Sequence, residues 1–75
     1  MVHMEDVRAI LARNIKAARK LLDLSQEDLA DRAQIDRTYV SGIERQVRNP
    51  TVTVVAKFAA ALGTTTADLL TDRSG

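Results

Sequence analysis

Apolar and polar positions along the chain repeat with the period of an α-helix. The first apolar stripe lies within residues 5–22 and consists of Val7, Ile10, Leu11, Ile15, Ala18, Leu21 and Leu22. Side chains three or four positions apart share one face of a helix, so this stripe can be buried as a unit. No segment alternates with period two for long enough to compete as a strand. The pattern predicts an all-α protein whose first helix spans residues 5–22.

Capping signals divide the rest of the chain into four further short helices. The residues that can accept the unpaired N–H groups at a helix start are Ser25, Asp36, Thr51 and Thr65. Asp28 completes a capping box with Ser25, and Gly63 suits the left-handed position after the fourth helix. The starts at Ser25 and Asp36 leave about seven or eight residues of helix and a tight turn between them. Such a pair predicts a helix-turn-helix, formed by the second and third helices.

Length and composition restrict the organisation and the chemistry. A chain of 75 residues has room for one small domain, which we expect over residues 5–72, with a loose extension over 1–4 and a tail over 73–75. Cysteine is absent and His3 is the single histidine, so we expect no disulfide, metal site or cofactor. No apolar run could cross a bilayer and no signal peptide is evident. We therefore expect a cytoplasmic protein with no membrane partner and no small-molecule ligand.

Charge is nearly balanced overall, at +1, but it is unevenly distributed. Residues 37–48 contain Arg37, Arg45 and Arg48 against the single carboxylate of Glu44. With Val40 and Ile43 facing inward, the other faces of the third helix carry Arg37, Thr38, Tyr39, Ser41 and Arg45. This set is rich in hydrogen-bond donors and lacks a carboxylate, which favours approach to a polyanion such as DNA.

The order of short motifs resembles the phage Cro and repressor type of helix-turn-helix domain, the XRE family. The motifs are LSQEDLA at 24–30, IER at 43–45, RNPT at 48–51, AAALG at 59–63 and DLL at 68–70. The similarity extends from residue 7 to residue 71. The segment DRTYVSGIER at 36–45 is especially similar to the controller proteins of restriction–modification systems, which are short dimeric regulators.

The resemblance implies a lambda-repressor-like fold and a role for each matched position. It implies base reading by Arg37, Thr38, Tyr39 and Ser41, and contact with the DNA backbone by Gln26, Arg45, Arg48 and Asn49. Bidentate contact of Arg37 with guanine is worth roughly 1–3 kcal/mol of discrimination. Loss of Arg48 is expected to weaken binding to all sequences equally and to lower the salt slope by about one. For Tyr39 two interpretations stay open: a ring packed against the second helix, or contact with a deformable base step.

The resemblance also implies structural roles. Arg19 and Glu44 are expected to form an ion pair between the first helix and the recognition helix. A homodimer is expected, with its interface on the last two helices, at Phe58, Leu62, Leu69 and Leu70; Phe58 is equally suited to the core.

Two positions depart from the family pattern, and a third carries a cost within its helix. Gln34 and Gln46 stand where the family commonly has glycine, and a left-handed backbone there costs about 1 kcal/mol. Gly42, inside the third helix, costs about 1 kcal/mol relative to alanine. Close approach to DNA or neutral tolerance could each explain this glycine.

The sequence therefore predicts a sequence-specific regulator of transcription that binds double-stranded DNA as a dimer on a pseudo-palindromic operator. Two alternatives keep the fold: an antitoxin-type regulator that also binds a toxin, and a protein–protein adaptor that does not read DNA. An enzyme is disfavoured, because the sequence provides no histidine-based or paired-carboxylate arrangement to activate a nucleophile.

Overall fold

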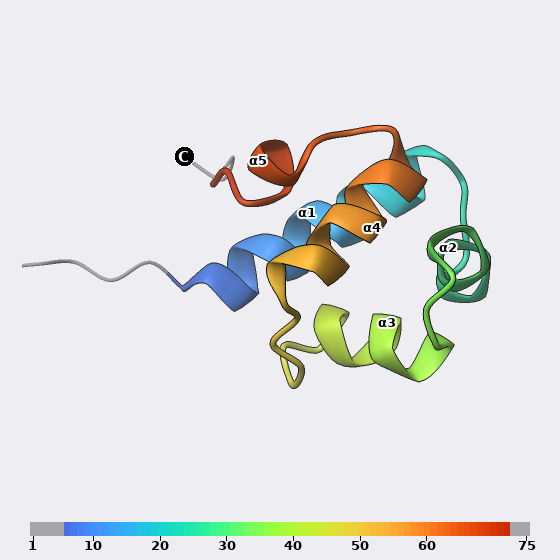
Figure 1. Ribbon diagram of the computed structural model, residues 1–75, viewed down its shortest axis with the longest axis horizontal. Coiled ribbons are helices and arrows are strands. Elements are labelled where there is room, and N and C mark those ends of the chain that lie inside the picture. The colour runs from blue at the N-terminus through green and yellow to red at the C-terminus, as the bar shows by residue number, and fades with distance from the viewer. Residues whose placement is uncertain (1–5, 73–75) are drawn as a thin grey trace, which may run out of the picture.

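A computed structural model of the protein describes residues 6–72, which form five α-helices and no strand (Figure 1). The helices are α1 (Val7–Leu21), α2 (Gln26–Ala33), α3 (Arg37–Glu44), α4 (Val52–Leu62) and α5 (Thr66–Leu69). The predicted all-α fold is confirmed, and α1 is slightly shorter than the 5–22 expected from its apolar stripe. The expected extension over 1–4, the tail over 73–75 and His3 lie outside the described residues.

The predicted caps begin the helices as expected. The hydroxyl of Ser25 accepts the N–H of Asp28 at 2.9 Å, and the Asp28 carboxylate accepts the N–H of Ser25 at 3.0 Å. Thr51 accepts the N–H of Val54 at 3.2 Å, and Thr65 accepts that of Asp68 at 3.0 Å. Each cap satisfies N–H groups that have no partner within their own helix. The helix boundaries therefore follow from local chemistry.

Left-handed backbone ends two of the helices. Gln34 has φ 56° after α2, and Gly63 has φ 68° after α4. Gln46, just past α3, has φ 64°, and Asp23, between α1 and α2, has φ 57°. The sequence predicted the positions of Gln34, Gln46 and Gly63, whereas Asp23 carried no comparable signal. A side chain at positive φ is strained, so three of these turns are formed at a local cost.

All five helices bury apolar side chains in one core. The largest side chains with almost no exposure are Phe58, Ile15, Leu29, Ile43 and Val40. They come from α1, α2, α3 and α4, and Leu69 of α5 joins them at 2% exposure. Because each helix is short, packing on this shared core contributes most of its stability.

Three of the four residues expected at the dimer interface are buried within the single chain. Phe58 is 0% exposed, Leu69 2% and Leu62 6%, all within the core of the single chain. Side chains this buried offer almost no surface in the single chain, so Phe58 fits the core position that the sequence also allowed. The dimer interface itself stays a prediction. Leu70 is half-buried and keeps exposed surface.

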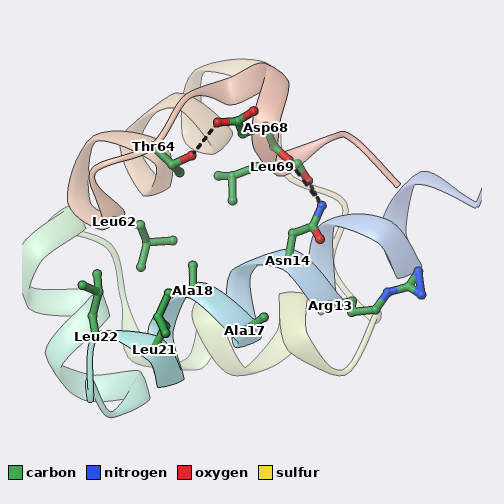
Figure 2. A pocket seen from close by; sticks show the side chains of 10 residues that line it. All are labelled: Arg13, Asn14, Ala17, Ala18, Leu21, Leu22, Leu62, Thr64, Asp68 and Leu69. Atoms are coloured by element: carbon green, nitrogen blue, oxygen red, sulfur yellow. Dashed lines mark hydrogen bonds between the residues drawn. The ribbon is translucent and has the colours of Figure 1, made fainter. Parts of the chain in front are cut away.

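Asn14 attaches α5 to α1. Its Nδ2 donates to the carbonyl oxygens of Leu69 and Thr71, each at 2.8 Å. The carbonyls at the end of a helix lack partners within that helix, so an amide from α1 can satisfy them. Figure 2 shows Asn14 pointing from α1 toward α5, beside an apolar groove of about 540 Å³ between α1, the end of α4 and α5. None of the residues that line this groove belongs to α2 or α3.

Candidate nucleic-acid interface

The second and third helices form the predicted helix-turn-helix. The N–H of Ile35 donates to the carbonyl of Ala30 at 2.9 Å, which closes the turn after α2. Asp36 then caps α3 by accepting the N–H of Thr38 at 2.8 Å. In Figure 1, α3 lies on the opposite side of α1 and α4 from α5. The inward side chains Val40 and Ile43 fix α3 to the core, and its other faces are left for a ligand.

Arg19 and Glu44, the pair expected from the resemblance, are joined by two hydrogen bonds. The Nε of Arg19 lies 2.8 Å from Oε2 of Glu44, and its Nη2 lies 2.9 Å from Oε1. The two side chains are 11% and 5% exposed. The pair therefore connects α1 to the end of the recognition helix, in surroundings mostly shielded from water.

Gln26 completes this network from α2. Its Nε2 donates to Oε1 of Glu44 at 3.2 Å. Burial raises the pKa of Glu44, but the hydrogen bonds from Arg19 and Gln26 and the nearby positive charges outweigh it, so the pKa is lowered overall. The side-chain hydrogen bond to Glu44 raises the pKa of Arg19, although burial opposes it. The carboxylate is thus ionised, and three helices meet on it.

The predicted base-reading residues lie together along α3. Arg37 and Thr38 are exposed in its first turn, whereas Tyr39 and Ser41 are half-buried. The hydroxyl of Thr38 donates to the Asp36 carboxylate. This bond and the one from the Thr38 N–H lower the pKa of Asp36. The predicted cap Asp36 therefore places a carboxylate at the N-terminus of α3, directly before the carboxylate-free set of outward side chains.

The residues after α3 fold back onto it. The guanidinium carbon of Arg48 lies 5.5 Å from the centre of the Tyr39 ring, within the range of a cation–π contact. The ring itself packs partly against the core. Arg45, Arg48 and Asn49 are all exposed. Backbone contacts expected of these residues thus have the necessary access, and Tyr39 has a partner that the sequence did not indicate.

Other kinds of site are not built in the described part of the chain. Among residues 6–72, no three His, Cys, Asp or Glu side chains gather where they could hold a metal ion. None of the helices described is long and apolar enough to span a membrane. The arrangement on α3 instead offers cationic and hydroxyl donors on a rigid support, which is suited to phosphates and base edges.

The fold and this donor-bearing helix define a helix-turn-helix domain of the Cro and repressor type. The chain belongs to the helix-turn-helix family, which matches residues 15–69. Control protein C.SmaI from Serratia marcescens is 41% identical over 66 residues, covering 88% of this chain and 79% of that protein. The predicted resemblance, including the similarity to controller proteins, is confirmed. The family comprises DNA-binding regulators of transcription.

Solved structures give the same result. The hypothetical transcription factor NHTF from Neisseria superposes with a TM-score of 0.89 at 38% identity, over 97% of this chain and 90% of that one. The restriction–modification controller protein C.Esp1396I, solved as a tetramer in complex with its natural 35 base-pair operator, superposes with a TM-score of 0.79 at 32% identity. That match covers 88% of this chain and 87% of the controller protein.

Proposed function

We propose that this protein is a sequence-specific, double-stranded DNA-binding regulator of transcription of the restriction–modification controller type. The observation that carries the proposal is the recognition helix itself. Its outward side chains are donors, and its orientation is fixed by the Arg19–Glu44–Gln26 network. The operator complex of the related C.Esp1396I supports DNA as the ligand. The related control protein C.SmaI comes from a bacterium, whose DNA lies in the cytoplasm, and this supports the cytoplasm as the place of action.

We assign base reading to the first half of α3 and phosphate contact to its surroundings. Arg37 is exposed in the first turn, the part of a recognition helix that enters the major groove, and its guanidinium can bind O6 and N7 of guanine. Thr38, Tyr39 and Ser41 follow on the same helix. Arg45 and Asn49 contact phosphates beyond its end. Gln26 contacts the backbone from α2, although its amide already donates to Glu44.

We further propose that the protein acts as a two-fold dimer through the surface of α4 and α5 around Leu70. This surface lies away from α3 (Figure 1), so a pair formed there leaves both recognition helices free. Two-fold symmetry would place them about 34 Å apart, one turn of DNA, and would require a pseudo-palindromic site.

Affinity selection from a random duplex library, repeated at two salt concentrations, tests this function. The expected result is enrichment of an inverted repeat whose half-sites lie about one helical turn apart. In the Arg37→Ala variant, selection at one guanine of each half-site should relax. Retention that falls with salt and enriches no sequence would show nonspecific electrostatic binding and overturn the proposal.

A further inference from the structure

Gly42 lies where a glycine is costly. It is buried in the interior of α3, and glycine there destabilises a helix relative to alanine. Its φ is not positive, since among the described glycines only Gly63 has that conformation. Conformational freedom therefore does not explain this residue.

The chain after α3 passes directly over Gly42. The N–H groups of Val47 and Arg48 both donate to the Gly42 carbonyl, at 2.9 and 3.2 Å. Gln46, in the left-handed conformation, makes this reversal. The backbone of Arg48 is thus fixed by hydrogen bonds to the helix interior.

The side chain of Arg48 then occupies the space that a side chain at position 42 would need. A Cβ added to Gly42 would lie 2.4 Å from Cγ of Arg48, a distance that side chains do not tolerate. From there Arg48 reaches Tyr39, where its guanidinium carbon is 5.5 Å from the ring centre. Gly42 and Tyr39 are three residues apart, so they share one face of the helix.

We propose that Gly42 determines DNA specificity indirectly, because its missing side chain lets Arg48 pack across α3 and stack on Tyr39. This inference rests on the proposed function. Long side chains lose rotamer freedom when they are ordered by a ligand. Stacking orders the Arg48 charge and the Tyr39 ring before DNA arrives, so the complex with the operator forms at a lower entropic cost. Gly42 is a positioning residue and contacts no DNA itself.

A four-member set tests the proposal: wild type, Gly42→Ala, Arg48→Ala and the double variant. The added methyl in Gly42→Ala meets Cγ of Arg48 and no backbone atom. Arg48 can therefore turn about its Cα–Cβ bond, and the helical circular dichroism should be unchanged. DNA binding is measured on the inverted repeat selected by the wild type and on a scrambled duplex of equal length. Gly42→Ala should lower the affinity for the selected repeat about two- to fivefold, the fold-change that corresponds to an exposed cation–π contact. Its affinity for the scrambled duplex and its salt slope should stay unchanged, because the charge of Arg48 is retained.

The Arg48→Ala background separates this mechanism from direct approach of the Gly42 backbone to DNA. Truncating Arg48 removes its Cγ and leaves its Cβ 3.5 Å from the added Cβ, an ordinary contact. The double variant should therefore bind like Arg48→Ala and melt at a higher temperature than it, because alanine favours the helix. An equal loss of affinity from Gly42→Ala in both backgrounds would show that the backbone itself approaches DNA and would overturn the proposal.

Nuclear magnetic resonance of the free protein provides a readout that needs no DNA. Tyr39 is the only tyrosine in a chain without tryptophan, and a ring shifts the resonances of protons above its face upfield. The side-chain protons of Arg48 should show this shift in the wild type and lose it in Gly42→Ala and in Tyr39→Leu. A shift that persists in Gly42→Ala would overturn the proposal even if the wild type selected no operator, whereas failure of the selection alone would overturn only the proposed function.

Discussion

A single guanidinium, that of Arg19, binds both oxygens of the Glu44 carboxylate and the carbonyl of Leu24. The distances are 2.8 and 2.9 Å to the carboxylate and 2.9 Å to the carbonyl. Arg19 thereby connects α1 to the recognition helix and to the loop that leads into α2. Apolar packing alone tolerates small rotations of a helix, but this directional arrangement fixes the rotation of α3 about its axis.

Removing the carboxylate should destabilise the fold before it affects any DNA contact. Glu44→Ala leaves the Arg19 charge shielded from water without its partner, and breaking a buried pair in this way costs about 3–5 kcal/mol. The free energy of unfolding, measured by urea denaturation, should fall by about 3 kcal/mol, the lower end of that range, because some exposure remains.

Arg13→Ala is the matched control for this prediction. Arg13 pairs with Asp72 at 4.0 Å, and the two side chains are 49% and 51% exposed. Surface pairs contribute about 0–1 kcal/mol, so this variant should unfold nearly like the wild type. Equal losses in the two variants would contradict a special role for the Arg19–Glu44 pair.

The same carboxylate predicts a dependence of stability on pH. The pKa of Glu44 is lower in the folded protein than its ordinary value of 4.5. The stabilisation of the folded state by the Glu44 carboxylate is therefore complete above pH 4.5. It is lost as the pH falls through the lowered pKa. The free energy of unfolding should be flat near neutral pH and decline below that value. Glu44→Gln should make this decline smaller, which urea titrations at neutral and acidic pH would measure. Glu27→Gln, at an exposed carboxylate of α2, is the control.

Glycine at position 34 should stabilise the protein. Gln34 has φ 56°, and relieving a left-handed side chain gains about 1 kcal/mol, less the greater flexibility of glycine in the unfolded chain. We expect Gln34→Gly to raise the thermal midpoint. Ala60→Gly, on the exposed face of α4, should lower the thermal midpoint, because glycine in a helix costs a similar free energy. If both substitutions lowered the midpoint, strain at Gln34 would not be the relevant quantity.

Local signals made most of the fold predictable from the sequence. Ser25, Thr51 and Thr65 mark helix starts because their hydroxyls satisfy N–H groups only two or three residues away. Gly63 marks a helix end for an equally local reason. The spacing of Val40 and Ile43 predicted which face of α3 points inward, and both side chains are buried in the structure. The outward residues followed from this.

Features that depend on contacts between distant elements could not be predicted in this way. Periodicity identifies Phe58 as apolar but does not say whether it faces its own core or a partner. The Arg48 side chain explains Gly42, but only the reversal after α3 brings the two together. The role of Asn14 in attaching α5 to α1 has no local signature in the sequence, because its acceptors lie 54 to 57 positions away along the chain.

Asn14→Ala tests that role. Without the amide, the carbonyls of Leu69 and Thr71 lose their donor. Water can reach the exposed Thr71 carbonyl, so we expect a loss of about 0.5–1.5 kcal/mol, the net contribution of a typical hydrogen bond. Because α5 is a single turn, we expect local opening rather than global unfolding. Hydrogen exchange of the amides in α5 should accelerate, while those of Ile15 and Leu29 in the core should change much less. Uniform acceleration through the chain would show that Asn14 supports the whole fold.

Leu70→Asp tests the proposed dimer surface. Leu70 directly follows α5 and is half-buried, unlike Leu69, which is 2% exposed. A carboxylate placed in a two-fold interface meets its own symmetry mate, so like charges and desolvation both oppose association. Sedimentation velocity should show a dimer for the wild type and a monomer for Leu70→Asp, with helical circular dichroism unchanged.

Leu21→Asp introduces the same charge at a leucine that is 87% exposed and should remain dimeric. A dimeric Leu70→Asp variant would move the interface to another surface, and a monomeric wild type would remove the dimer from the proposed function. Because each half-site alone provides only one recognition helix, loss of the dimer should also abolish selection of an inverted repeat while sparing weak binding to any duplex.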